Sequence, residues 1–191
     1  MQNLPVVMCV DRAGKVGADG ETHQGVFDLS FFKIIPNITI MAPKDFKELE
    51  QMLEFAISLK KPAVIRYPRG GEPEEKFKMH KEIKLGKSEL LQEGKDVTLI
   101  GIGKGLEKAL EKEKELKQNG KSVEIINCRF LKPLDKEQIL KSIKKTKNVI
   151  TFEDNSLIGG LGSSLKGLII DEKLQNINIT TIGYEDKFIS Y

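Results

Sequence analysis

Two periods of apolar and polar positions run through the chain, and each predicts a different element. Short apolar runs indicate strands, whereas apolar residues that return every three or four positions indicate helices with one buried face. The runs predict strands at residues 4–10, 38–41, 63–65, 97–102, 123–127, 148–152 and 177–182, with residues 83–91 as an edge strand or hairpin arm. The longer period predicts a helical turn at residues 28–32 and helices after Asp45, Gly105, Asp135 and Gly162.

The helix after Asp45 has the clearest amphipathic pattern. Asp45 and Glu48 have the spacing of a capping box, in which each side chain accepts a backbone amide of the first turn. One apolar stripe is expected to face the core and consists of Phe46, Leu49, Met52, Leu53, Ala56 and Ile57.

The order of the elements predicts an α/β fold in two units. From residue 97 onward strand and helix alternate, which favours a mainly parallel sheet with helices on both faces. Residues 70–76 are polar and turn-rich, so we expect the boundary there, between units 1–75 and 76–191. A buried strand that starts almost at residue 1 also leads us to expect further chain upstream.

Composition and charge exclude several classes of protein. Lys and Arg number 31 against 28 Asp and Glu, and the basic residues are scattered, so no nucleic-acid surface is expected. No apolar run reaches the length of a membrane span. Cys9 and Cys128 lie in apolar runs and are expected to be small buried residues rather than a disulfide, which favours a reducing, cytoplasmic setting.

Candidate chemistry gathers between residues 11 and 27. This segment follows the first predicted strand and contains four glycines, which favours a loop that approaches a ligand closely at a strand end. Its polar residues include Arg12, Asp19, Thr22, His23 and Gln24. The residue types leave two interpretations open, an active-site loop and a well-capped structural loop, in which Asp19 would accept the loop's own amides.

Further candidates lie at other strand and helix ends. Arg69 follows Pro68 on a stiff turn, where a guanidinium would bind a phosphate or carboxylate, or form a structural ion pair. A structural ion pair is the better interpretation for Arg66. The glycines at 101–105 and 159–162 indicate tight strand-to-helix turns; the second could also bind an anion. We expect His80 to face solvent.

Three strings resemble one enzyme family. Residues 11–28, Asp-Arg-Ala-Gly-x-Val-Gly-x-Asp-Gly-x-Thr-His-Gln-Gly-x-Phe-Asp, resemble the signature of 1-deoxy-D-xylulose-5-phosphate synthases, thiamine-diphosphate-dependent relatives of transketolase. The strings Arg-Tyr-Pro-Arg-Gly at 66–70 and Glu-Asp-Asn at 153–155, with Gly-Gly-Leu-Gly-Ser at 159–163, agree with it. The resemblance implies the second half of a pyrimidine-binding domain (1–75) and a transketolase C-terminal domain (76–191) that is truncated at its end.

The resemblance also implies roles. Arg12 and Arg69 would hold the phosphate of glyceraldehyde 3-phosphate, and Asp19 and His23 would be catalytic residues facing the substrates. The enzyme would condense pyruvate with that aldehyde, with loss of CO₂, for isoprenoid, thiamine and pyridoxal precursors. It would be a homodimer that also needs its own N-terminal part. Thiamine diphosphate and Mg²⁺ would bind upstream, so no cofactor or metal residue is expected here and the fragment alone would be inactive.

Two alternatives stay open. The chain could be part of another thiamine-diphosphate enzyme, either transketolase or the β subunit of a 2-oxoacid dehydrogenase. The Asp-Arg-Ala-Gly and Tyr-Pro-Arg-Gly strings speak against both. It could also be a non-catalytic fragment that only docks to a partner carrying the cofactor site.

Overall fold

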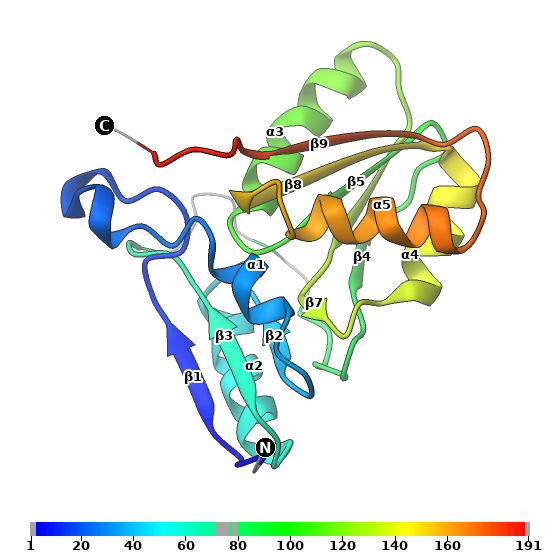
Figure 1. Cartoon of the computed structure of the whole chain (residues 1–191). Coiled ribbons are helices and arrows are strands. Elements are labelled where there is room, and N and C mark those ends of the chain that lie inside the picture. Colours follow the sequence, from blue (N-terminus) through cyan, green and yellow to red (C-terminus); the bar gives the residue numbers. More distant parts are fainter. Residues whose placement is uncertain (1–2, 72–76, 78–79, 190–191) are drawn as a thin grey trace.

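The two predicted units form two sheets in a computed structural model that describes residues 3–71, 77 and 80–189 (Figure 1). The first sheet has the order β1-β3-β2-β7 and the second β4-β6-β5-β8-β9. The strands of the first sheet are β1 (Val7–Val10), β2 (Thr39–Met41), β3 (Ala63–Arg66) and β7 (Phe130–Lys132). Those of the second are β4 (Glu89–Gln92), β5 (Val97–Gly101), β6 (Val123–Asn127), β8 (Asn148–Ser156) and β9 (Asn178–Tyr184).

Both sheets are mainly parallel, which confirms the predicted α/β class. In the first, β3 pairs in parallel with β1 and β2, and only β7 is antiparallel. In the second, β6, β5, β8 and β9 are parallel neighbours, and β4 is the antiparallel edge. The helices are α1 (Asp28–Lys33), α2 (Phe46–Ser58), α3 (Gly105–Gln118), α4 (Lys136–Thr146) and α5 (Leu161–Asp171), with single turns at Gly17–Asp19 and Glu21–His23.

The period-2 pattern of the strands explains how the helices are sorted between faces. Leu99 of β5 packs in one apolar cluster with Leu106 and Ala109 of α3. Ile100, its neighbour, points the other way into a cluster that contains side chains of α4 and α5. Alternate residues of a strand face opposite sides of the sheet, so α3 covers one face and α4 and α5 the other.

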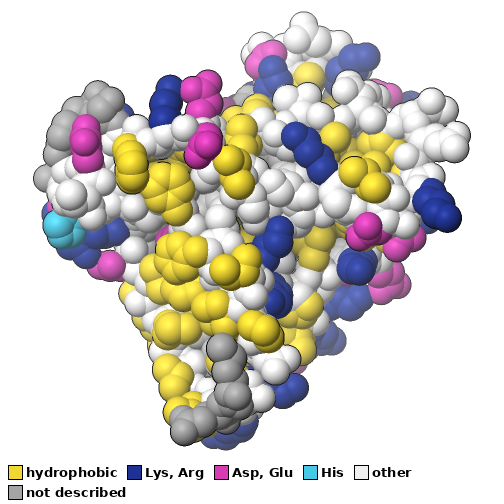
Figure 2. All heavy atoms as spheres, viewed as in Figure 1, with side chains coloured by type: hydrophobic (Ala, Val, Ile, Leu, Met, Phe, Trp, Pro, Cys, Tyr) yellow, Lys and Arg dark blue, Asp and Glu magenta, His cyan; other side chains and the backbone are white. Residues whose placement is uncertain are grey.

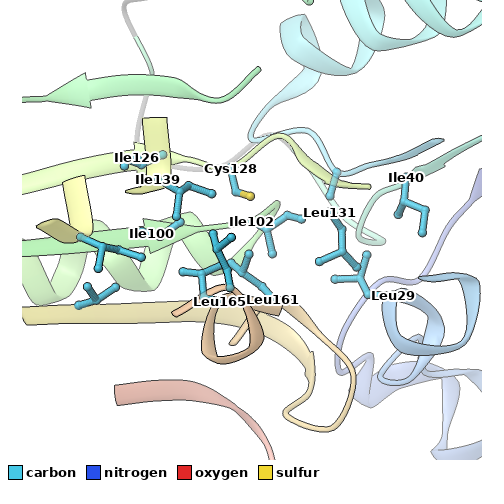
Figure 3. Packing of buried hydrophobic residues seen from close by; sticks show 14 of the residues in the cluster. Leu29, Ile40, Ile100, Ile102, Ile126, Cys128, Leu131, Ile139, Leu161 and Leu165 are labelled. Carbon is cyan, nitrogen blue, oxygen red and sulfur yellow. The ribbon is translucent and has the colours of Figure 1, made fainter. Parts of the chain in front are cut away.

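One core joins the two sheets. The cluster around Ile100 continues through Leu131 to Leu29 and Ile40 of the first unit (Figure 3). Strand β7 strengthens the connection because it comes from beyond residue 75 yet pairs with β2. The expected boundary at residues 75 and 76 lies outside the described residues. The two units therefore share a core and a sheet.

Several local expectations need correction. Residues 4–10 were expected to be a buried strand, but β1 lies at the edge of its sheet, and Leu4 and Val6 before it are 54% and 49% exposed. Cys9 is exposed rather than buried, whereas Cys128 is buried as expected. The stripe of α2 is only partly covered, since Phe46, Leu53 and Ile57 are exposed.

The start of α2 is capped, although not by a reciprocal box. The Asp45 carboxylate accepts the Glu48 amide at 2.8 Å, as predicted. The Glu48 carboxylate instead accepts the Lys44 amide at 2.7 Å. His80, expected in solvent, lies with its Nε2 2.6 Å from the Asp45 carboxylate and is only partly exposed.

The glycines at 101–105 serve tight turning, as predicted. A Cβ on Gly101 would lie 2.5 Å from the Leu106 Cα, so β5 and the start of α3 leave no room for a side chain. On the surface, hydrophobic side chains gather over α1 and over the β1 side of the first sheet (Figure 2). Phe31 and Ile34 of this region are exposed.

Candidate functional site

The loop at residues 11–27 leaves the carboxyl end of β1 next to that of β3. The two strands are parallel and in register at Val10 and Arg66, so both chains emerge at one edge of the sheet. Backbone bonds continue the pairing beyond the strands: the Tyr67 amide donates to Val10 O at 3.0 Å, and the Ala13 amide donates to Tyr67 O at 3.1 Å. Parallel sheets place ligand crevices at this edge.

The two predicted phosphate-binding arginines meet at one carboxylate. Arg12 Nε lies 2.7 Å from one oxygen of Asp19, and Arg69 Nη1 binds the other oxygen. Their side chains are 39% and 51% exposed, and that of Asp19 is 16% exposed. Arg12 also pairs with Asp11. Two guanidinium groups that share one carboxylate are close enough to share one phosphate.

The alternative interpretation of Asp19 was a cap that accepts the loop's own backbone amides. The contacts of its carboxylate are different. Its two carboxylate oxygens accept the arginine side chains instead. The ion-pair alternative for Arg69 is present, with Asp19 as its partner. Arg69 also lines a cavity of about 390 Å³ together with Pro43, Tyr67 and Lys104.

The fourth predicted site residue, His23, is not drawn into this cluster. It ends the turn Glu21–His23 and is exposed. Within the described part of the chain, the hydrogen bond of its imidazole joins Nδ1 and the Thr22 hydroxyl, which lie 2.9 Å apart. The neighbouring Gln24 amide reaches Ile189 O at 3.2 Å, which ties this turn to the chain after β9.

A buried ionic group, the acidic network (Arg66, Asp28 and Asp154), lies beneath the loop. Arg66 Nε donates to Asp28 at 2.8 Å and Nη1 to Asp154 at 2.5 Å, and all three residues are at most 4% exposed. The prediction of a structural ion pair for Arg66 is confirmed. Burial raises the pKa of Asp28, and the charge of Asp154 adds to the rise against the pull of Arg66.

A second buried group, the balanced network, joins the units at the start of α2. Arg129 binds Glu48 at 2.7 Å and Glu89 at 3.3 Å, and Lys44 pairs with the same two carboxylates. All four side chains are at most 2% exposed. Asn127 donates to Glu48 at 3.0 Å. Two cations thus face two carboxylates.

The glycine-rich start of α5, where the sequence also allowed an anion to bind, is occupied by a side chain of the protein. The Glu153 carboxylate accepts the Leu161 and Gly162 amides at 2.8 and 2.9 Å. Burial raises the pKa of Glu153 to about 7, against the lowering by these two amides. A Cβ on Gly160 would collide with this carboxylate, which explains the glycine there.

Sequence reasoning did not place Asp28, Glu153 and Asp154 in the buried interior. A signal was present, because three polar residues directly follow the apolar run 149–152. Among the residues that the structure describes, no group of three or more His, Cys, Asp and Glu could hold a metal ion. The described helices include none that is long and apolar enough to cross a membrane.

Comparison with known proteins agrees with these features. The family model of the transketolase pyrimidine-binding domain matches residues 1–73, and that of the transketolase C-terminal domain matches residues 86–184. Curated proteins named 1-deoxy-D-xylulose-5-phosphate synthase from Halothermothrix orenii and Clostridium tetani are 47% and 44% identical over the whole chain, which spans 30% and 31% of their lengths.

A solved structure titled "Split gene transketolase, inactive beta4 tetramer" is also similar. It is 31% identical, with a TM-score of 0.84 over 95% of this chain and 58% of that one. The arginine pair at the sheet edge, the two domain matches and the curated relatives lead to one assignment. The chain belongs to the 1-deoxy-D-xylulose-5-phosphate synthase branch of the transketolase family, and its residues 1–73 and 86–184 match the pyrimidine-binding and C-terminal domain models of that family.

Proposed function

We propose that the chain supplies the aldehyde-binding part of an enzyme that joins pyruvate to glyceraldehyde 3-phosphate with loss of CO₂. The observation that carries the proposal is the convergence of Arg12 and Arg69 on one carboxylate at the edge of a parallel sheet. Guanidinium groups form bidentate, charge-assisted bonds to phosphate. A phosphate dianion has more charge and more acceptor oxygens than the Asp19 carboxylate, so it would compete for both arginines.

In this proposal each loop residue binds a different part of the two substrates. Arg12 and Arg69, the arginine clamp, hold the phosphate. Once the phosphate has replaced Asp19 on the two arginines, the Asp19 carboxylate accepts a hydrogen bond from a hydroxyl of the aldehyde. Exposed His23 donates or accepts a hydrogen bond on the pyruvate side.

Thiamine diphosphate, held with Mg²⁺ by residues outside this chain, supplies the carbanion chemistry in the assembled cytoplasmic enzyme. No step is assigned to a metal ion bound by this chain.

The test is a set of loop variants in the full-length enzyme. Arg12→Ala and Arg69→Lys should each raise KM for glyceraldehyde 3-phosphate and leave KM for pyruvate nearly unchanged. Losing a charge-assisted contact costs roughly ten- to a hundred-fold in kcat/KM. Lys15→Ala is the matched control, because Lys15 is an exposed cation of the same loop whose backbone amide, not its side chain, donates to Tyr184. His23→Ala should lower kcat instead. Equal losses for both substrates would contradict the clamp.

A second proposal, for the chain by itself, is docking without catalysis. Strand β1 is an edge strand preceded by the exposed Leu4 and Val6. Unpaired edges and exposed apolar surface recruit other chains. The similar solved structure is a split-gene transketolase described as inactive and tetrameric, which supports the same idea here.

Light scattering and mass spectrometry test docking. We expect either self-association of the chain or a co-purified N-terminal part, and no tight binding of thiamine diphosphate in calorimetric titration. A monomer at high concentration with no second polypeptide would contradict docking through β1. Micromolar cofactor binding, about −8 kcal/mol, would contradict the placement of the cofactor site outside the chain.

A further inference from the structure

The last residues of β8 reach from the second unit to the loop at 11–27. The Asp154 carboxylate and backbone carbonyl accept Arg66 Nη1 and Nη2 at 2.5 and 2.9 Å. The Ser156 amide donates to Val26 O at 2.6 Å. The Asn155 side chain accepts the Leu29 amide at 3.2 Å, directly after the loop. This segment therefore holds both Arg66 and the end of the loop.

Arg66 also forms a hydrogen bond to the part of the loop that is bonded to Arg12. Its Nη2 donates to Gly25 O at 2.6 Å, and the Gly14 amide donates to the same carbonyl at 2.8 Å. The Gly25 amide in turn donates to Arg12 O at 2.8 Å. Two residues thus separate Asp154 from Arg12 of the arginine clamp, namely Arg66 and Gly25, and each link is a hydrogen bond or ion pair.

In addition to these bonds, the loop backbone at Gly14 packs directly against the Asp154 carboxylate. A Cβ on Gly14, which has φ +75°, would lie 2.8 Å from Asp154 Oδ2. A Cβ on Gly25 would lie 2.7 Å from Arg12 O. The loop therefore rests on the Asp154 carboxylate with no space for side chains. Arg12 itself has φ +59°, a conformation that non-glycine residues keep only where their surroundings fix it.

We propose that Asp154 and Arg66 are positioning residues, through which β8 of the C-terminal domain fixes the backbone of Arg12 and so the geometry of the arginine clamp. The effect on substrate rests on the proposed function, whereas the effect on the loop does not. Oδ2 of Asp154 is buried and has no hydrogen-bond partner among the described residues. A buried acceptor left unpaired costs stability, so its place against Gly14 serves the loop rather than the fold.

The experiment compares two buried carboxylates in the full-length protein. Asp154→Ala removes the support of the loop, and Glu89→Gln is the matched control because Glu89 is a buried carboxylate of the balanced network, away from the loop. Hydrogen exchange at the Gly14 and Gly25 amides should accelerate about tenfold in Asp154→Ala and stay unchanged in Glu89→Gln. KM for glyceraldehyde 3-phosphate should rise roughly tenfold in Asp154→Ala, with KM for pyruvate unchanged.

The outcomes separate the two proposals. Faster exchange with both KM values unchanged would support positioning of the loop and contradict a phosphate-binding role for Arg12. Unchanged exchange, or equal acceleration in both variants, would overturn the positioning role. Should Asp154→Ala fail to fold, Asp154→Asn takes its place, because it keeps the acceptor for Arg66 and removes the charge. Arg66→Met is measured beside it. Unchanged hydrogen exchange and unchanged KM in both variants would overturn the proposal.

Discussion

The two buried ionic networks join the same two units but are built differently. The balanced network sets two cations against two carboxylates, and none of its side-chain atoms is among the unpaired buried atoms found in the described residues. The acidic network sets one cation against two carboxylates, and Asp28 and Asp154 each keep one buried oxygen without a partner. Only the acidic network touches the loop that carries the candidate site.

The difference shows where this protein accepts a stability cost. A buried ion pair with complete partners is costly to break, whereas an excess buried charge is costly to keep. The excess lies directly beneath Gly14 and Gly25, where the loop needs close support. Proteins commonly keep locally unfavourable arrangements at functional sites and compensate for them elsewhere.

The largest expected effect comes from breaking the balanced network. Arg129→Met should lower the free energy of unfolding by about 3–5 kcal/mol, because Glu48 and Glu89 lose a buried cation. Denaturant unfolding measures it. Lys47→Ala is the control, since the Lys47–Glu50 pair is exposed and should change the unfolding midpoint very little. A loss below about 1 kcal/mol for Arg129→Met would show that the network holds little of the fold.

The next effect concerns pH. The pKa of Glu153 is raised from 4.5 to about 7, so folding favours its protonated form. The contribution of protonated Glu153 to the free energy of unfolding is fully present below the pKa of the unfolded state and is lost as pH rises through about 7. From pH 4.5 to above pH 7 the wild type should therefore lose about 3 kcal/mol relative to Glu153→Gln.

Unfolding titrations of both proteins at several pH values provide this comparison. Parallel stability curves for the wild type and Glu153→Gln would contradict the raised pKa.

The smallest effect compares one carboxylate from each network. Glu89→Gln should cost about 1.5–3 kcal/mol, because both Lys44 and Arg129 lose an ionised partner. Asp28→Asn should cost less than about 1 kcal/mol, since the amide oxygen still accepts Arg66 and one excess charge disappears. Unfolding at pH 7 gives both values. A larger cost for Asp28→Asn would reverse the comparison between the networks.

The sequence was informative where a pattern is local. Strand β5 and helix α3 were predicted because their apolar residues repeat at clear periods, and Gly101 marks the turn between them. The loop was predicted from its residue types and resemblance. The meeting of Arg12 and Arg69 was foreseeable because both follow strands that could be parallel neighbours.

What could not be predicted depends on distant pairing. Strand β7 has three residues, too few for a period, and exists because β2 offers it an edge. Asp154 and Arg66 are 88 positions apart, so their charges gave no sign that they would be buried together. His80 was expected in solvent because nothing nearby in the sequence points to Asp45 as its partner.

Strand β7 has a consequence for synthesis on the ribosome. The apolar cluster between α2 and the first sheet contains Met52 and Ala56, and also Phe130 of β7, which is fully buried. The first unit therefore cannot complete its core when residue 71 emerges, and it has to wait until residue 132 has left the exit tunnel. During that interval β2 has an unpaired edge, which exposes the nascent chain to pairing with strands of other chains.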